Sequence, residues 1–443
     1  MGNKVALHNL GCKVNAYEVE AMQQLLEKAG YEIVPFEEGA DIYLINTCTV
    51  TNIADRKSRQ MLHKAKKMNP DAIVVATGCY VQTDTQKLEA DSAVDLILGN
   101  NQKKQIVEAL EEYEKEHAKK VKVIEINKTK EYEDLSIGYT AEHVRAYIKV
   151  QDGCNQFCTY CIIPYARGRV RSRKIAEVLE EVRTLAARGY KEVVLTGIHL
   201  SSYGLDFPKE ERESLLSLIQ AVHEVDGIAR IRLGSLEPRI ITEEFMEGIS
   251  ALPKLCPHFH LSLQSGCDKT LKNMNRRYSA PEYAEKCELI RKFYPAPALT
   301  TDVIVGFPME TEEDFEDSYE FVKNIHFYET HIFKYSRRQG TKAAAMNGQL
   351  TEAVKAQRSE KMLKLHEIRA KEYETSMIGR TLELLLEEEV EIGGKTYFMA
   401  HSKEYVRAVI EKTDAHKVND LVKAKAVDFA DEHVLLAICE DLY

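Results

Sequence analysis

The residues of this chain best suited to carry chemistry are three cysteines in one short stretch. Cys154, Cys158 and Cys161 stand at a CxxxCxxC spacing within residues 145–169, RAYIKVQDGCNQFCTYCIIPYARGR. Three thiolates at this spacing can hold three corners of a [4Fe-4S] cluster and leave the fourth iron without a protein ligand. A structural zinc site is the alternative, but zinc ribbons bring cysteines as two separated CxxC pairs, and this sequence has no second CxxC. The spacing favours a cluster with one iron open to chemistry.

A second set of three cysteines lies at the ends of predicted strands. Cys12 follows VALHNLG, Cys48 follows IYLINT and Cys79 follows AIVVATG. The carboxyl ends of parallel strands meet at one edge of a sheet, where such folds bind ligands, so these thiols can converge. Three unrelated buried thiols are the alternative, since free cysteine is a common core residue. The repeated position at strand ends favours a second ligand set.

The elements that must position these cysteines divide the chain into three units and a linker. Residues 1–115 alternate strands with helices, which predicts a doubly wound parallel-sheet α/β domain. Residues 116–142 are charged and poorly periodic, and we expect a linker with one or two short strands. Residues 143–375 hold six β/α units, two fewer than a full (β/α)8 barrel, which indicates a partial barrel open on one side.

The last unit, residues 376–443, has a different pattern. Five short strands with turns such as Gly393-Gly394 predict a small all-β barrel of a kind that often carries oligonucleotides. The three units together give an α/β protein with an all-β end.

Composition limits the classes of function. The net charge of −10 argues against nucleic-acid binding through the whole surface, so any RNA site must be local. One candidate is residues 153–176, which contain no Asp or Glu and carry Arg167 and Arg169 just beyond the cysteines. No run of eighteen apolar residues and no signal-peptide layout occur, so we expect a cytoplasmic protein without a membrane partner.

Taken together, these motifs resemble the methylthiotransferase family of the radical S-adenosylmethionine (SAM) superfamily. The resemblance rests on GCKVN, NTCTVT and TGCY, then on the CxxxCxxC motif with Tyr160 inside it, then on the small terminal barrel, which this family calls TRAM. It implies an auxiliary [4Fe-4S] cluster on Cys12, Cys48 and Cys79. It implies a SAM-binding [4Fe-4S] cluster on the other three cysteines.

The resemblance also implies a SAM pocket at the ends of the barrel strands, where barrel enzymes keep their active sites. The matching segments are LTGIHLSSYG, GSLEP, HLSLQSG and TDVIVGFPMET. They assign SAM contacts to Gly197, His199, Ser235, Glu237, Gln264, Ser265, Asp302 and Gly306.

The reaction implied by the resemblance is the attachment of sulfur and methyl to an unactivated C–H bond. Side-chain acid-base chemistry cannot do this, so the cofactors must supply a radical. One SAM methylates a sulfur carried on the auxiliary cluster, and a second yields the 5′-deoxyadenosyl radical. An external electron donor and a sulfur donor are implied. A non-catalytic iron-sulfur protein that binds RNA through its terminal barrel is the alternative of a different class.

For the substrate we favour N6-threonylcarbamoyladenosine in the anticodon loop of tRNA, converted to its 2-methylthio derivative. The segment LGCKVNAYE, residues 10–18, is similar to the branch that modifies this nucleoside. Isopentenyladenosine in tRNA and a ribosomal-protein aspartate are the alternatives. A threonylcarbamoyl group carries a carboxylate, so its pocket should offer a cation. At the end of the sixth barrel strand, Lys334, Arg337 and Arg338 are the candidates.

Overall fold

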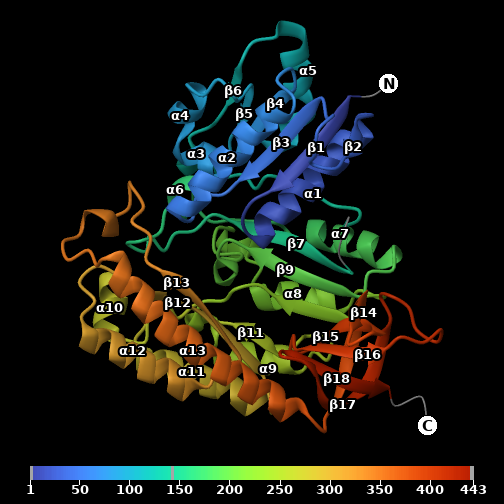
Figure 1. Cartoon of the computed structure of the whole chain (residues 1–443), viewed down its shortest axis with the longest axis vertical. Coiled ribbons are helices and arrows are strands. Elements are labelled where there is room, and N and C mark those ends of the chain that lie inside the picture. Colours follow the sequence, from blue (N-terminus) through green and yellow to red (C-terminus); the bar gives the residue numbers. More distant parts are fainter. Residues whose placement is uncertain (1–2, 141–143, 440–443) are drawn as a thin grey trace.

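The computed structural model describes residues 3–140 and 144–439. Figure 1 shows three units: an N-terminal α/β domain, a central half-open barrel below it, and a small β-barrel at one end of the central unit. Each unit corresponds to one of the three architectures predicted above.

The N-terminal domain is built on a six-stranded parallel sheet in the order β2-β1-β3-β4-β5-β6. β3 is buried at every position, as expected for a strand covered on both faces. The sixth strand comes from the segment that we expected to be a linker. The strands are β1 (Lys4–Asn9), β2 (Glu32–Val34), β3 (Ile42–Thr47), β4 (Ile73–Gly78), β5 (Leu96–Leu98) and β6 (Lys120–Lys122). The helices are α1 (Lys13–Lys28), α2 (Asn52–Met68), α3 (Cys79–Thr83), α4 (Thr85–Glu89) and α5 (Ile106–Glu116).

The central unit has the six predicted barrel strands. They form two parallel arcs, β10-β9-β7 and β11-β12-β13, joined by the bridges Ile231–Leu255 and Leu236–Leu261. Short β8 (Arg171–Ser172) pairs antiparallel with β7. The barrel strands are β7 (Arg145–Asp152), β9 (Glu192–Gly197), β10 (Arg230–Leu233), β11 (His258–His260), β12 (Ala298–Val305) and β13 (Glu329–Lys334).

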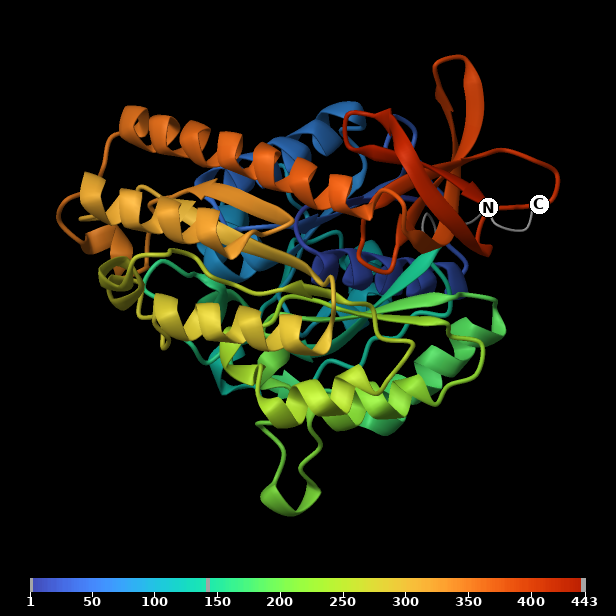
Figure 2. The ribbon, with the colours of Figure 1, turned by 90° about the horizontal axis from the view of Figure 1, so that it is seen from below.

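Helices cover the outer face of this partial barrel, as seen from below in Figure 2. They are α7 (Ile175–Ala187), α8 (Leu215–His223), α9 (Glu243–Ser250), α10 (Asp268–Asn273), α11 (Ala280–Phe293), α12 (Glu312–Ile325) and α13 (Glu352–Met377). The short helix α6 (Ile163–Arg167) packs instead against α3 of the N-terminal domain. Short 3-10 helices lie at Lys103–Gln105, Ile126–Lys128, Leu200–Ser202, Lys209–Glu211, Pro238–Ile240 and Ala343–Ala345. The N-terminal domain meets the barrel where α1 packs against β7 and β9.

The terminal unit is the predicted five-stranded closed barrel, in the order β14-β15-β16-β18-β17. Alternate residues of its strands face one apolar core, which includes Leu384, Phe398 and Leu435. The strands are β14 (Thr381–Ile392), β15 (Lys395–Ser402), β16 (Arg407–Glu411), β17 (Leu421–Asp431) and β18 (Val434–Cys439).

A buried group of charges attaches this terminal barrel to the central unit, and we call it the C-terminal junction. Glu192 of β9 lies at its centre, 2.9 Å from Arg232 and 3.1 Å from Arg145. Arg232 also donates to the Lys403 carbonyl of the terminal barrel at 3.0 Å. The junction consists of Arg145, Arg230 and Arg232 with Glu192, Glu383 and Glu387.

Within residues 3–140 and 144–439, no helix combines the length and the apolar character needed to cross a membrane.

Candidate functional site

The first three cysteines come together because their strands are neighbours in the sheet. Cys12 follows β1, Cys48 follows β3 and Cys79 follows β4, and these three strands pair in that order. Cys12 is the N-cap residue of α1, yet its side chain does not cap the helix. Gly78 turns the chain into Cys79 at φ +97, where a Cβ atom would lie 2.4 Å from the Asn46 side chain. The fold thus presents three thiols at one sheet edge.

The surroundings of this strand-end triplet suit metal-bound thiolates. Arg167 Nε donates to Cys79 Sγ at 3.1 Å, and Asn100 Nδ2 lies 3.8 Å from the same sulfur. Burial raises the pKa of Cys48 to about 11, and the neighbouring thiols of Cys79 and Cys12 add to that rise. Without a metal the Cys48 thiol holds its proton at neutral pH, and a metal would replace that proton. Three thiols with N–H donors beside them fit an iron-sulfur cluster.

Arg167 belongs to a buried group of charges between the N-terminal domain and the barrel, which we call the N-terminal junction. Its guanidinium is fully buried and donates to Glu18 at 3.0 Å and to Asn15 at 2.5 Å. We expected this side chain to contact RNA phosphate, but its partners hold it inside the protein. The junction consists of Lys103, Lys149, Arg167 and Arg171 with Glu18 and Asp152.

The CxxxCxxC cysteines lie in the loop after β7. Gly153 adopts φ +72, and a Cβ atom there would lie 1.8 Å from the Arg169 carbonyl oxygen, so only glycine fits. The Cys154 N–H donates to the Gly168 carbonyl at 3.0 Å, and the Thr159 N–H donates to the Met274 carbonyl at 3.0 Å. These bonds hold the loop at both ends.

Hydrogen-bond donors also surround this second triplet. Arg276 Nη1 lies 3.3 Å from Cys158 Sγ, and the Gln156 N–H lies 3.4 Å from Cys154 Sγ. Burial raises the pKa of Cys154 to about 11 and that of Cys161 to about 12. The donor set fits a cluster for the same reasons as the first triplet.

Two residues predicted to contact SAM form a chain that ends at this loop. His199 Nε2 lies 3.6 Å from Glu237, and Gln156 of the loop donates to Glu237 at 3.3 Å. His199 Nδ1 lies 2.7 Å from the Ser202 hydroxyl. Burial and the nearby Arg276 charge lower the pKa of His199 to about 4, so its imidazole is neutral at neutral pH.

The other predicted SAM contacts differ in burial and in their hydrogen-bond partners. Gln264 adopts φ +73, and its N–H donates to the Asp302 carbonyl at 2.8 Å, so these two positions are adjacent. Ser265 is fully buried and its hydroxyl accepts from the Cys267 N–H at 3.2 Å. The Gly306 N–H donates to Glu310 at 2.7 Å. Gly197, Ser235 and Asp302 face the cavity described next.

A cavity of about 460 Å³ lies inside the partial barrel, and we call it the central cavity. Cys12 of the strand-end triplet forms part of one wall, and the strand ends at Gly197 and Ser235 form part of another. Its lining residues are Cys12, Lys13, Val14, Thr196, Gly197, Leu233, Gly234, Ser235, His258, His260, Thr300, Asp302, Glu329, His331 and Tyr405. Cys12 of the strand-end triplet and three residues predicted to contact SAM, Gly197, Ser235 and Asp302, therefore line one cavity.

The remaining basic residues predicted for RNA or substrate differ in exposure. Arg169 is exposed and lies over the Phe157 ring at 4.6 Å. Lys334 and Arg337 are also exposed. Arg338 is only 5% exposed, and it donates to Thr49 at 2.6 Å and to Asn52 at 2.9 Å in the N-terminal domain. None of the four lines the central cavity.

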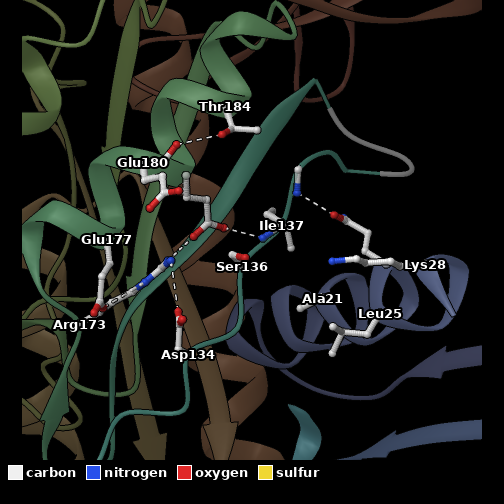
Figure 3. A pocket seen from close by; sticks show the side chains of 13 residues that line it. Ala21, Leu25, Lys28, Asp134, Ser136, Ile137, Arg173, Glu177, Glu180 and Thr184 are labelled. Carbon is white, nitrogen blue, oxygen red and sulfur yellow. Dashed lines mark hydrogen bonds and ion pairs between the residues drawn. The ribbon is translucent and has the colours of Figure 1, made fainter. Parts of the chain in front are cut away.

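A second cavity, of about 420 Å³, lies between α1, residues 134–138 and α7 (Figure 3). Arg173 reaches Asp134 there at 3.6 Å and also pairs with buried Glu181. No cysteine of the described chain lines it. We therefore assign the chemistry to the central cavity.

Several residues of the site escaped the sequence analysis. Arg276 follows α10 with no spacing that links it to Cys158. From the sequence, Lys13 only helped to distinguish one branch of the family from the others, although it lines the central cavity. Tyr405 comes from the loop between β15 and β16 of the terminal barrel. Only tertiary structure brings these residues together.

Comparison with known proteins gives a family match for each cysteine triplet. Residues 4–99 match the Uncharacterized protein family UPF0004, and residues 148–322 match the Radical SAM superfamily. The first range contains the strand-end triplet and the second contains the CxxxCxxC motif.

Two curated relatives extend the likeness over most of the chain. The threonylcarbamoyladenosine tRNA methylthiotransferase MtaB of Bacillus subtilis is 41% identical over 95% of this chain and 93% of that protein. The tRNA-2-methylthio-N(6)-dimethylallyladenosine synthase of Moorella thermoacetica is 37% identical over 85% of this chain and 85% of that protein. The two identities differ little, so the site must help to separate the two substrates.

A solved structure shares the fold. The radical SAM methyltransferase TsrM from Kitasatospora setae, with cobalamin and a [4Fe-4S] cluster bound, matches with a TM-score of 0.56 at 16% identity. The match covers 75% of this chain and 75% of that chain. At this identity the likeness concerns the fold alone.

Proposed function

Because the chain belongs to the radical SAM tRNA methylthiotransferase family, we propose that it converts N6-threonylcarbamoyladenosine beside the anticodon of tRNA to its 2-methylthio derivative. The observation that carries this proposal is the central cavity, which has Cys12 on one wall and the SAM-side strand ends on another. An adenine that enters this cavity meets both sites at once. A splayed anticodon-loop base can enter in this way, whereas a base in a duplex cannot.

We assign the strand-end triplet to the auxiliary [4Fe-4S] cluster and the CxxxCxxC triplet to the SAM-binding one. When bound, the clusters and SAM supply the radical, the sulfur and the methyl group. Arg167 and Arg276 stabilise thiolates through N–H donors at 3.1 and 3.3 Å. The reaction also requires an external electron donor and a sulfur donor, and we place it in the cytoplasm.

Removing one triplet tests the two ligand sets. Replacing Cys154, Cys158 and Cys161 with Ala should leave about half of the iron after anaerobic reconstitution, because the other set is independent. Replacing Cys256, Cys267 and Cys287, which lie in neither triplet, with Ala is the matched control. Full iron content in the first variant would contradict the assignment.

For SAM we propose the contacts predicted above, with those that line the central cavity, Gly197, Ser235 and Asp302, nearest the substrate. For RNA we propose the exposed Arg169, Lys334 and Arg337. Each phosphate contact that is lost should weaken binding and lower the salt slope by about 1. Arg169→Glu should show this in a salt titration of tRNA affinity, and an unchanged slope would remove Arg169 from the RNA surface.

The substrate is tested with two tRNAs, one bearing threonylcarbamoyladenosine and one bearing isopentenyladenosine. The reconstituted enzyme, with SAM and a reductant, should form a methylthio product only on the first. Product only on the second would select the isopentenyl alternative. Failure to form 5′-deoxyadenosine under any condition would favour the non-catalytic RNA-binding alternative.

A further inference from the structure

Lys13 is a cation in the lining of the central cavity. It is the first residue of α1, directly after Cys12. Its ammonium lies 5.9 Å from the centre of the Tyr147 ring, and among the described residues it forms no ion pair. Lys13 is exposed, and it belongs to the lining of the cavity. A lysine in such a place attracts an anionic ligand.

The position of Lys13 strengthens this attraction. The first N–H groups of a helix carry partial positive charge, so a lysine at a helix start is unfavourable unless an anion lies near it. Two other cations approach the same wall, because Arg145 and Arg232 stack on the ring of Tyr405 at 5.2 and 4.5 Å. Glu192 pairs with both of those arginines, whereas the charges of Glu192 and Glu329 act on Lys13 without either carboxylate forming an ion pair with it among the described residues.

The cavity also offers an acceptor. Glu329 begins β13 and lines the cavity, and among the described residues its side chain forms no hydrogen bond or ion pair. A threonylcarbamoyl group carries one carboxylate, one hydroxyl and N–H groups, so it can use both a cation and an acceptor. An isopentenyl group can use neither, and placing one here would remove water from both charged groups without giving either a hydrogen bond.

We propose that Lys13 binds the threonyl carboxylate of the substrate and so selects threonylcarbamoyladenosine over nucleosides whose N6 group carries no charge. This inference rests on the proposed function. It replaces Lys334, Arg337 and Arg338 as the carboxylate site, since none of these lines the central cavity.

The test measures binding to anticodon stem-loops by the reconstituted holoenzyme, kept anaerobic and without reductant so that no turnover occurs. Three stem-loops are compared: one with threonylcarbamoyladenosine, one with its methyl ester, and one with unmodified adenosine. The wild type should prefer the free carboxylate to the ester by about 10- to 100-fold, as expected for one charge-assisted hydrogen bond.

Lys13→Met should erase this preference and leave binding of the ester and of the unmodified loop unchanged. Lys13→Arg should keep the preference, because it keeps the cation. Lys28→Met, the same substitution at the last residue of α1, is the matched control and should behave as the wild type. Iron content is measured in each variant, since Lys13 adjoins Cys12.

A preference that survives in Lys13→Met would overturn the inference. His260, Asp302 and His331 bring ligand atoms within 4.8 Å of one another, so they could read the carboxylate through a metal ion instead. A preference lost only in His331→Ala would select that group. The proposed function fails separately, if the wild type makes no methylthio product from the threonylcarbamoyl tRNA.

Discussion

The two junctions that attach the outer domains to the barrel differ in their balance of charge. The N-terminal junction holds four cations, from Lys103, Lys149, Arg167 and Arg171, against two carboxylates. The C-terminal junction pairs three arginines with three glutamates. Only the first touches a cysteine of either triplet, through Arg167 and Cys79.

The arginines of the two junctions also differ in the groups that accept their remaining hydrogen bonds. In the C-terminal junction the spare N–H groups bind backbone carbonyls, as Arg230 does with the His401 carbonyl at 3.0 Å. In the N-terminal junction the excess lies beside the thiol of Cys79, where the thiolates of the cluster that we propose there would add negative charge. The arginines and glutamates of the C-terminal junction are therefore equal in number, whereas the positive charge of the N-terminal junction would be offset by the cluster that we propose on the cysteines.

The largest effect should follow from breaking the N-terminal junction with Arg167→Met. Glu18 and Asp152 would lose one buried partner but keep Lys103, Lys149 and Arg171, so we expect a cost near the lower end for a broken buried pair, about 3–4 kcal/mol in the free energy of unfolding. About half of the bound iron should also be lost, because the Cys79 thiolate loses its donor. Iron analysis and urea unfolding measure the two effects. Arg169→Met, at an exposed position nearby, should change neither. Full iron content in Arg167→Met would contradict the link between the junction and the cluster.

The matching change in the C-terminal junction is Glu192→Gln. It should cost about 3–4 kcal/mol, near the lower end for a broken buried pair, because Glu383 and Glu387 still hold two of the arginines. Iron content should stay at the wild-type level. Urea unfolding and limited proteolysis of the terminal barrel measure the loss. Glu389→Gln, at an exposed pair with Lys412, is the control, and equal destabilisation there would contradict a special role for Glu192.

Acid should weaken the C-terminal junction in a defined range. The guanidinium of Arg232 and then that of Arg145 lower the pKa of Glu192 from its usual 4.5 to about 2. The contribution of this carboxylate is therefore complete above pH 4.5 and is lost as the pH falls towards 2, by about 3 kcal/mol in total. The stability gap between the wild type and Glu192→Gln should shrink on acidification. If the difference in stability between the two proteins does not change with pH, the pKa of Glu192 is not lowered in the folded state.

The smallest effect should come from Arg338, a third contact between the N-terminal domain and the barrel loop. Arg338→Met removes the hydrogen bonds that Arg338 donates to Thr49, Asn52 and Asp55, while Asp55 keeps the hydroxyl of Thr49 as a donor. It should cost about 1–3 kcal/mol, with tRNA affinity unchanged. Arg337, the exposed residue next to Arg338, should behave in the opposite way. Arg337→Met should lower tRNA affinity and leave the free energy of unfolding unchanged. The same pattern in both variants would show that burial does not separate their roles.

The fold could be predicted in detail because its signals are local. Strand and helix alternation gave the parallel sheets and the six barrel units, and five short strands gave the terminal barrel. The strand-end cysteines could be placed together because parallel strands share a direction, and Cys48 and Cys79 directly follow neighbouring strands.

The roles of the basic residues could not be predicted in the same way. Arg167 lies in a stretch without acidic residues, which indicated an RNA surface, yet its carboxylate partner Glu18 comes from α1 of another domain. Arg338 was likewise predicted to contact the substrate, yet it pairs with Asp55 of the N-terminal domain. Whether an arginine is buried depends on carboxylates far away in sequence, and periodicity carries no information about them.

Through Tyr405, the terminal barrel contributes a residue to the lining of the central cavity. Its loop takes a left-handed backbone at φ 72, and its ring stacks between His401 at 4.5 Å and His258 at 5.2 Å while it lines the central cavity. A chimera that exchanges the terminal barrel with that of a relative therefore exchanges a piece of the cavity wall as well. The barrel is not an interchangeable module, and its loop and the interior of the central unit must be inherited together.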